Sequence, residues 1–295
     1  MVSNLPPLAF SILVIQYLFV ALGIGALVSQ FASSKAPTGL PTWNAGAGMF
    51  GLFAVVVMCC FFAVSTMAVL PFISFPQGET SDGIVTGVPA ISPTILLGAS
   101  IITQIVVPVV IFFLLKAFAP GYAFNFPEIR VGRLFQWKLG FVLLGCFATV
   151  GLAGFVVSQL QVLLDHAVGM KLVWDKQEIM DVFLKNRDNP ILMSLAFLTA
   201  VVGAPIWEEL FFRGCVYRFF KGIENRHMAA AITGTLFALI HFNAVAFIPL
   251  ALLGAYLCHV YERTGDIRVP IVVHALFNLN SFLIMLLAPE LHDIF

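Results

Sequence analysis

Long apolar segments separated by short polar loops constrain the fold of this chain more than any other feature of its sequence. A membrane-spanning helix needs about 20 mostly apolar residues. Backbone polar groups in lipid must be satisfied inside a helix or a closed barrel. We therefore expect an all-α, polytopic transmembrane helix bundle with about eight spans. The segments lie at about residues 8–32, 46–75, 92–117, 139–163, 190–220, 228–243, 245–262 and 270–288.

The overall composition supports a membrane location. The 295 residues are 60% hydrophobic and only 10% charged, whereas soluble domains are about half apolar and a quarter charged. Lipid must therefore cover part of the apolar surface. The formal net charge is zero, which argues against a nucleic-acid partner. The five cysteines show no CxxC spacing, so we expect reduced packing residues.

The distribution of lysine and arginine predicts how the bundle lies in the membrane. About eleven of these residues fall in the loops after the first, third, fifth and seventh segments, and the positive-inside rule places such loops in the cytoplasm. Both termini are then outside it, and we expect a multi-pass protein of the bacterial cell membrane. Segment 176–187 has one apolar stripe among charged residues, which predicts a short interfacial helix.

Ionisable residues concentrate in the last four apolar segments. At mid-membrane such a side chain costs about 3 kcal/mol or more, and its presence is a functional signal by default. The adjacent Glu208 and Glu209 lie in the fifth segment, which also holds Arg213. His241 ends the sixth segment, and His274 lies in the eighth. We expect these side chains, with Asn278, to form one polar site among the final helices.

The two adjacent glutamates of the fifth segment are expected to have different roles. Glu209 and Arg213 are four residues apart, so they share a helix face and are expected to pair. Glu208 points about 100° away from Glu209 around the helix, which leaves it as the candidate for chemistry. Pro205 removes one backbone donor and frees the carbonyl of Val201 in an α-helix. The resulting kink would open space beside Glu208, although a proline merely tolerated in a membrane helix is the alternative.

Helix geometry gives the expected depth of each side chain. Counting about 1.5 Å per residue from the cytoplasmic ends places Glu208 about 18 Å deep and His241 about 20 Å deep. The same count places His274 and Asn278 only about 6–12 Å below Pro270. Tilt or a longer loop would have to close this difference.

These residue types suit hydrolysis by an activated water molecule. A buried glutamate can accept a proton from water that an imidazole helps to hold. Asn278 and His274 are donors able to stabilise the oxyanion that forms at an attacked peptide carbonyl. Glu208, His241 and His274 could instead bind a divalent metal such as zinc, with water at an open position. The helical HExxH spacing is absent, so no cofactor is certain and the metal stays open.

Three motifs resemble those of a known family. They are Glu208-Glu209-x-x-x-Arg213, Phe237-x-x-x-His241 and His274-x-x-x-Asn278. In order and spacing they resemble the motifs of the CPBP intramembrane proteases, also called the Abi family, which include the type II CAAX prenyl endopeptidases. The resemblance covers about residues 138–288. It implies a protease domain at 138–295 and an N-terminal three-helix membrane extension at 1–137.

The resemblance also implies roles for the motif residues. Glu208 and His241 would activate water, His274 and Asn278 would stabilise the oxyanion, and Glu209, Arg213 and Phe237 would have supporting roles. We therefore expect an intramembrane endopeptidase that acts, from the cytoplasmic side, on a peptide or protein substrate in contact with the lipid bilayer. Whether that substrate is membrane-associated or lipidated stays open.

Two other functions compete with this interpretation. A non-catalytic immunity or scaffold protein of the same family is the first, although a scaffold has no use for buried charge. A transporter that relays protons through glutamate and histidine is the second. It predicts inverted internal repeats, and the sequence shows none.

Overall fold

The computed structural model describes residues 5–32, 40–43, 46–72, 92–119, 137–168 and 186–293. Every regular element in these ranges is helical, as expected for an all-α membrane bundle. The expected interfacial helix at 176–187 falls almost entirely outside the described residues.

The helices form three groups along the chain. The N-terminal helices are α1 (Pro7–Ala32), α2 (Ala47–Val69, continued by the 3-10 turn Leu70–Phe72), α3 (Pro93–Phe118) and α5 (Trp137–Val168). A long interrupted helix follows, made of α7 (Pro190–Phe197), the π-helical η3 (Leu198–Gly203), α8 (Ala204–Phe211), the π-helical η4 (Phe212–Tyr217) and α9 (Arg218–Ile223). The last group is α10 (Arg226–Leu239), α11 (Phe247–Thr264), α12 (Arg268–Leu287) and the 3-10 turn Pro289–Asp293.

The expected count of eight spans is not confirmed. Six helices in the described part of the chain are long and apolar enough to cross a membrane: α1, α2 with its 3-10 turn, α3, most of α5, the α7–α9 helix and α12. The two short segments near 228–243 and 245–262 form instead the helices α10 and α11, which pack against each other as a hairpin. The 14 residues of α10 extend only about 21 Å, less than the hydrocarbon thickness of about 30 Å.

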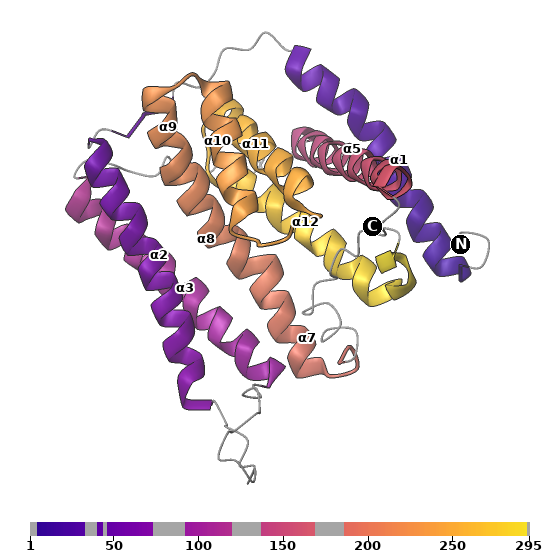
Figure 1. Ribbon diagram of the computed structural model, residues 1–295, viewed down its shortest axis with the longest axis horizontal. Coiled ribbons are helices and arrows are strands. Elements are labelled where there is room, and N and C mark those ends of the chain that lie inside the picture. The colour runs from indigo at the N-terminus through magenta and orange to yellow at the C-terminus, as the bar shows by residue number, and fades with distance from the viewer. Residues whose placement is uncertain are drawn as a thin grey trace.

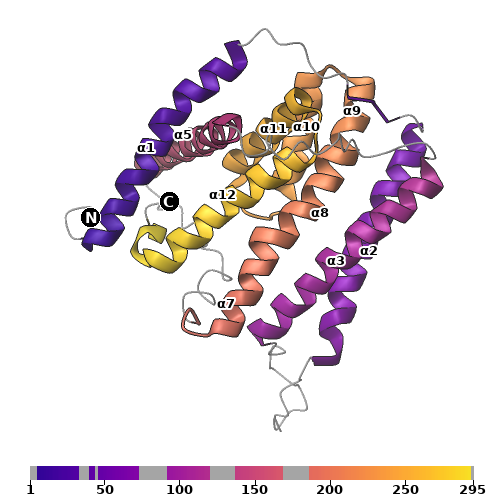
Figure 2. The same ribbon diagram turned by 180° about the vertical axis from the view of Figure 1, so that it is seen from behind.

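The α7–α9 helix lies at the centre of the molecule (Figures 1 and 2). The pair α2–α3 covers one of its sides, and α3 contacts α7, η3 and α8 directly. The α10–α11 hairpin and α12 lie on the other side, with α1 and α5 beyond them. Both views show the same order, so the helix that bears Glu208 is enclosed from two directions.

Local sequence signals set several helix ends. Asn189 caps α7 by accepting hydrogen bonds from the backbone of Ile191 and Leu192, and Pro190 occupies the first turn, where its missing N–H costs nothing. Asn225 caps α10 in the same way. Gly265 ends α11 with a positive φ of 66°, a conformation that glycine adopts without steric cost.

Aromatic packing joins the N-terminal helices to the central helix. Phe53 of α2 is fully buried, and its ring lies 6.4 Å from that of Phe211 in α8. Phe61 of α2 contacts the ring of Trp207 at 5.0 Å. These contacts belong to one buried cluster, so α2 and α3 pack directly against the central helix.

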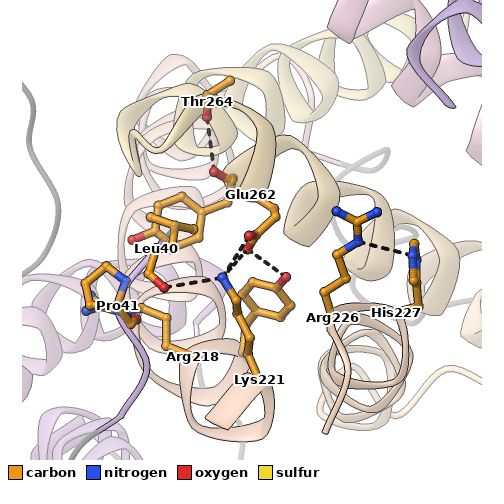
Figure 3. A network of polar contacts seen from close by, with 10 residues as sticks. Leu40, Pro41, Arg218, Lys221, Arg226, His227, Glu262 and Thr264 are labelled. Atoms are coloured by element: carbon orange, nitrogen blue, oxygen red, sulfur yellow. Dashed lines mark hydrogen bonds and ion pairs between the residues drawn. The ribbon is translucent and has the colours of Figure 1, made fainter. Parts of the chain in front are cut away.

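A polar network fastens the segment before α2 to the end of the central helix (Figure 3). Arg218 donates from Nε to the carbonyl of Pro41 at 2.6 Å. Lys221 donates to the carbonyl of Leu40 at 3.3 Å and forms an ion pair with Glu262 of α11 at 2.7 Å. Residues far apart in the sequence therefore meet where α9 and α11 end.

Candidate functional site

The central helix changes register just before Glu208. In η3 the N–H of Ala204 bonds to the carbonyl of Thr199, five residues back instead of four. The next donor in this π register would belong to residue 205, which is proline and has no N–H. The carbonyl that receives a side-chain donor instead is that of Ala200, one residue earlier than the Val201 expected from α-helical spacing. The expectation was wrong because it assumed an unbroken α-helix.

Glu209 and Arg213 form the expected ion pair inside the protein. Arg213 Nη1 lies 2.8 Å from Glu209 Oε1, and both side chains are fully buried. Arg213 also donates from Nη2 to the carbonyl of Gly254 in α11 at 3.0 Å. Its guanidinium lies over the ring of Phe237, 4.7 Å from the ring centroid. The pair therefore connects α8 with both helices of the hairpin.

His274 of α12 lies between the two glutamates. Its Nδ1 is 2.9 Å from Glu209 Oε1, and its Nε2 is 3.9 Å from Glu208 Oε2. Glu209 Oε1 accepts from Arg213 Nη1. Nδ1 is therefore assigned as the donor in the short contact with the same oxygen, which leaves Nε2 facing Glu208. Glu209 thus orients the imidazole through Nδ1, and Nε2 is directed toward Glu208.

The expected difference in depth between His274 and Glu208 is not observed, because the two side chains are in contact. Ile267, immediately before α12, is fully buried. The neighbouring Asp266 and Arg268 stay partly exposed, so α12 begins at the edge of the bundle. The count from Pro270 therefore underestimated the depth of His274.

His241 lies in a turn and not in the helix that its spacing suggested. The helix α10 ends at Leu239, and the N–H of His241 bonds back to the carbonyl of Ala238 at 3.2 Å. The next residue, Phe242, has a φ of 48°, which is uncommon for a residue other than glycine. His241 Nδ1 lies 2.7 Å from the carbonyl of Phe237. A carbonyl only accepts, so Nδ1 carries a hydrogen and Nε2 faces away from this bond.

Phe237 is the apolar centre of the constellation. Its fully buried ring lies 4.7 Å from the ring of His241 and 5.8 Å from that of His274. Together with the guanidinium of Arg213 above its face, the ring keeps three polar groups apart and in fixed directions.

The structure brings most of the predicted site residues together. Glu208, Glu209, Arg213 and His274 are joined by polar contacts, and His241 is linked to them through Phe237. His241 has no ionic contact with Glu208 within 4 Å in the described part of the chain. Asn278 donates at 2.8 Å to the carbonyl of Ala200. The catalytic roles of these residues stay predictions.

Sequence reasoning missed the backbone groups of the site. The carbonyls of Gly254 and Ala200 accept from Arg213 and Asn278, and neither glycine nor alanine carries a side-chain signal that could identify it. Gln104 of α3 was also missed. Its side chain packs so closely on Gly203 that a Cβ there would clash with it. Only its position at the middle of an apolar segment distinguished this amide in the sequence.

The residues as they lie do not form a metal site. No group of three His, Cys, Asp or Glu side chains among residues described by the structure is close enough to hold an ion. Glu208 and His274 approach each other, but His241 is held by the carbonyl of Phe237 and is not close enough to complete the set.

Comparisons with known proteins identify relatives of this chain. Residues 190–280, which hold every motif residue, match the family described as "Type II CAAX prenyl endopeptidase Rce1-like". The UPF0177 protein YbdI of Lactococcus lactis subsp. lactis (strain IL1403) is 30% identical over 167 residues, which cover 55% of this chain and 83% of YbdI. The UPF0177 protein YaiH of the same strain is 33% identical over 86 residues, which cover 28% of this chain and 34% of YaiH.

A third relative has a functional name. The membrane-embedded CAAX protease MroQ of Staphylococcus aureus (strain USA300) is 30% identical over 170 residues, which cover 55% of this chain and 64% of MroQ. No solved structure matches the chain. The division between an extension at 1–137 and a protease domain at 138–295 stays a prediction.

Proposed function

The chain belongs to the CPBP family, with its Rce1-like type II CAAX prenyl endopeptidases, and on that premise we propose that it hydrolyses a peptide bond inside the membrane with a water molecule activated by Glu208 and His241. The single observation that carries the proposal is the buried Glu208 carboxylate, whose nearby ionic partner is His274 Nε2 at 3.9 Å. The adjacent buried Glu209 is already paired with Arg213, and the buried Glu262 is paired with Lys221. Glu208 is thus the carboxylate available as a base.

In the proposed hydrolysis, Glu208 first accepts a proton and later returns it. Glu208 takes a proton from water held by His241 Nε2, and the water oxygen bonds to the peptide carbonyl carbon. Negative charge develops on the carbonyl oxygen. In its imidazolium form His274 donates from both nitrogens, to Glu209 and to this oxygen, and an Asn278 amide hydrogen is the second donor. The C–N bond then breaks as Glu208 returns its proton to the leaving amine.

The basic residues at one end of the bundle support access from the cytoplasm. Arg218 and Lys221 lie at the end of the central helix, Arg226 begins α10, and Arg263 and Arg268 flank the turn after α11. The positive-inside rule favours the cytoplasm for this end. The α10–α11 hairpin leaves the membrane on the side where it enters, so the orientation does not depend on whether these helices count as spans. We propose a peptide or protein substrate that reaches the site from this side.

Cleavage of a peptide library by the purified protein in detergent or liposomes tests the proposal. Glu208→Gln keeps the shape of the side chain and removes the base, so we expect activity to fall by about 100-fold or more. His241→Ala should have a similar effect. The control is Glu224→Gln, which neutralises an exposed glutamate beside the same helix. Cleavage by both site variants at the parent's rate would disprove the proposal.

Chelation tests whether the activity needs a metal ion. Since the described residues do not form a three-ligand cluster, we expect activity to survive strong chelation followed by dialysis. The zinc content of the purified protein is measured in parallel. Stoichiometric zinc that disappears in His241→Ala would replace the carboxylate mechanism with a metal-dependent one.

A further inference from the structure

The break before the active-site helix leaves one backbone carbonyl without its usual partner. Within η3 the hydrogen bonds run five residues back, as from Ala204 to Thr199. In this register the carbonyl of Ala200 would accept from residue 205, and Pro205 has no N–H to give. In lipid an unsatisfied carbonyl costs several kcal/mol. A donor from elsewhere is therefore required at this point.

Asn278 of α12 supplies that donor. Its Nδ2 lies 2.8 Å from the carbonyl oxygen of Ala200. Because a carbonyl oxygen only accepts, the amide nitrogen and not the amide oxygen must face it, which fixes the rotation of the side chain. The bond joins residues 78 positions apart in the chain, and α12 packs on both η3 and α8.

We propose that Asn278 is a positioning residue that replaces the backbone hydrogen bond removed by Pro205 and thereby holds α12 against the active-site helix. His274 lies one helical turn before Asn278 on the same helix and contacts both glutamates. A fixed α12 at Ala200 sets the distance from His274 Nε2 to Glu208. The bond uses one of the two amide hydrogens, and the second is oriented by the first.

The hydrogen bond itself does not depend on what the protein catalyses, whereas its effect on turnover rests on the proposed function. A double-mutant cycle between residues 205 and 278 therefore tests the hydrogen bond independently of turnover. Pro205→Ala returns an N–H to the central helix, which can satisfy the carbonyl of Ala200 from within. If Asn278 replaces that N–H, the loss of its side chain should matter less once the N–H is present.

The first measurement is thermal unfolding of the purified full-length protein in detergent. In the Pro205 parent, we expect Asn278→Ala to lower Tm by about 2–4 °C, the effect of losing one hydrogen bond in a protein of this size. In the Pro205→Ala background the same substitution should lower Tm by less than half as much. Equal falls in the two backgrounds would overturn the proposal. If Asn278→Ala does not fold, Asn278→Leu, which has a similar size and no donor, is compared in the same two backgrounds.

Asn280→Ala is the matched control. Asn280 lies on the same helix, and its amide exchanges two hydrogen bonds with Gln16 of α1 at 3.0 and 3.1 Å, away from Ala200. Its effect on Tm should be the same with Pro205 and with Ala at that position. If the fall in Tm caused by Asn280→Ala is also halved in the Pro205→Ala background, the coupling is not specific to Asn278. That result would overturn the proposal.

The second measurement is the rate of peptide cleavage. We expect Asn278→Ala to lower kcat by roughly 100-fold or more with little change in KM, since it removes the second oxyanion donor and also releases α12, which misplaces His274. Adding Pro205→Ala should restore part of kcat. Coupling in Tm without recovery of kcat would limit Asn278 to stability and overturn its positioning role. If the parent cleaves no peptide, the proposed function fails while the Tm cycle still tests the hydrogen bond.

Discussion

At the scale of single residues, the site depends on a line of polar contacts that begins far from Glu208. The carbonyl of Gly254 accepts from Arg213, Arg213 pairs with Glu209, and Glu209 orients His274, which faces Glu208. Each buried charge in this line has a partner, as it must in a medium of low dielectric constant. The same contacts that offset the cost of burial therefore determine where the reactive groups point.

Replacing Glu209 by Gln should be strongly destabilising. The change leaves the Arg213 guanidinium buried without a countercharge, and breaking a buried pair in this way costs about 3–5 kcal/mol. We expect the free energy of unfolding to fall by that amount, measured by denaturant titration in mixed micelles. Activity should fall as well, because His274 Nδ1 then faces a neutral amide in place of the carboxylate that orients it.

Asp266→Asn is the control for that experiment. Asp266 pairs with Arg268 at 2.7 Å, but both side chains are partly exposed. Loss of an exposed pair costs about 1 kcal/mol or less. Similar losses in the two variants would show that the buried Glu209–Arg213 pair contributes no more to stability than the partly exposed pair.

At the scale of helices, the α10–α11 hairpin is held by contact between backbones. A Cβ added at Gly234 would clash with the carbonyl oxygen of Ala251 and lie 2.8 Å from the nitrogen of Ala255. A Cβ at Gly254 would lie 2.7 Å from Cα of Gly234. Small residues allow this close approach of helices in membranes. The approach presents the carbonyl of Gly254 to Arg213 and places His241 in the turn of the hairpin.

Gly234→Ala should therefore separate the two helices. The new methyl group meets backbone atoms, which cannot move aside as a side chain would, so we expect a loss of about 1–3 kcal/mol in the free energy of unfolding. Gly98→Ala in α3 is the control, because nothing lies within 4 Å of its added Cβ. There alanine should be neutral or stabilise by up to about 1 kcal/mol. Equal effects of the two substitutions would contradict close packing at Gly234.

At the scale of the whole molecule, the N-terminal helices complete the enclosure of the active-site helix. Phe53 and Phe61 of α2 contact Phe211 and Trp207 on either side of the two glutamates. Lys221 and Arg218 hold the segment before α2 against the end of the central helix (Figure 3). We infer that α2 and α3 limit the directions from which a substrate can approach Glu208.

Phe53→Ala tests this packing. Phe53 is fully buried, and truncation of such a side chain leaves a cavity that costs about 3–5 kcal/mol. We expect a lower melting temperature and a faster reaction of the buried Cys215 with a thiol reagent. Phe155→Ala is the control, since Phe155 is 62% exposed and its loss should change stability by about 0.5 kcal/mol or less. If Phe53→Ala lowers stability no more than the control does, α2 does not support the central helix.

The sequence alone determined the membrane-embedded all-helical class and the Glu209–Arg213 pair. Both follow from local rules, since long apolar runs must form helices in lipid and residues four apart share a helix face. It also predicted that two glutamates and His274 would meet, although helix counting alone gave the wrong depth for the histidine.

Only the tertiary structure decided the features that arise between distant segments. The π register before Pro205 gives the carbonyl of Ala200, and not that of Val201, to Asn278 of another helix. The α10–α11 hairpin, the turn at His241 and the contact of His274 with both glutamates likewise depend on packing with neighbours. No local pattern encodes these features, because a backbone carbonyl or a helix end acquires its partner only when residues far apart in the chain come into contact.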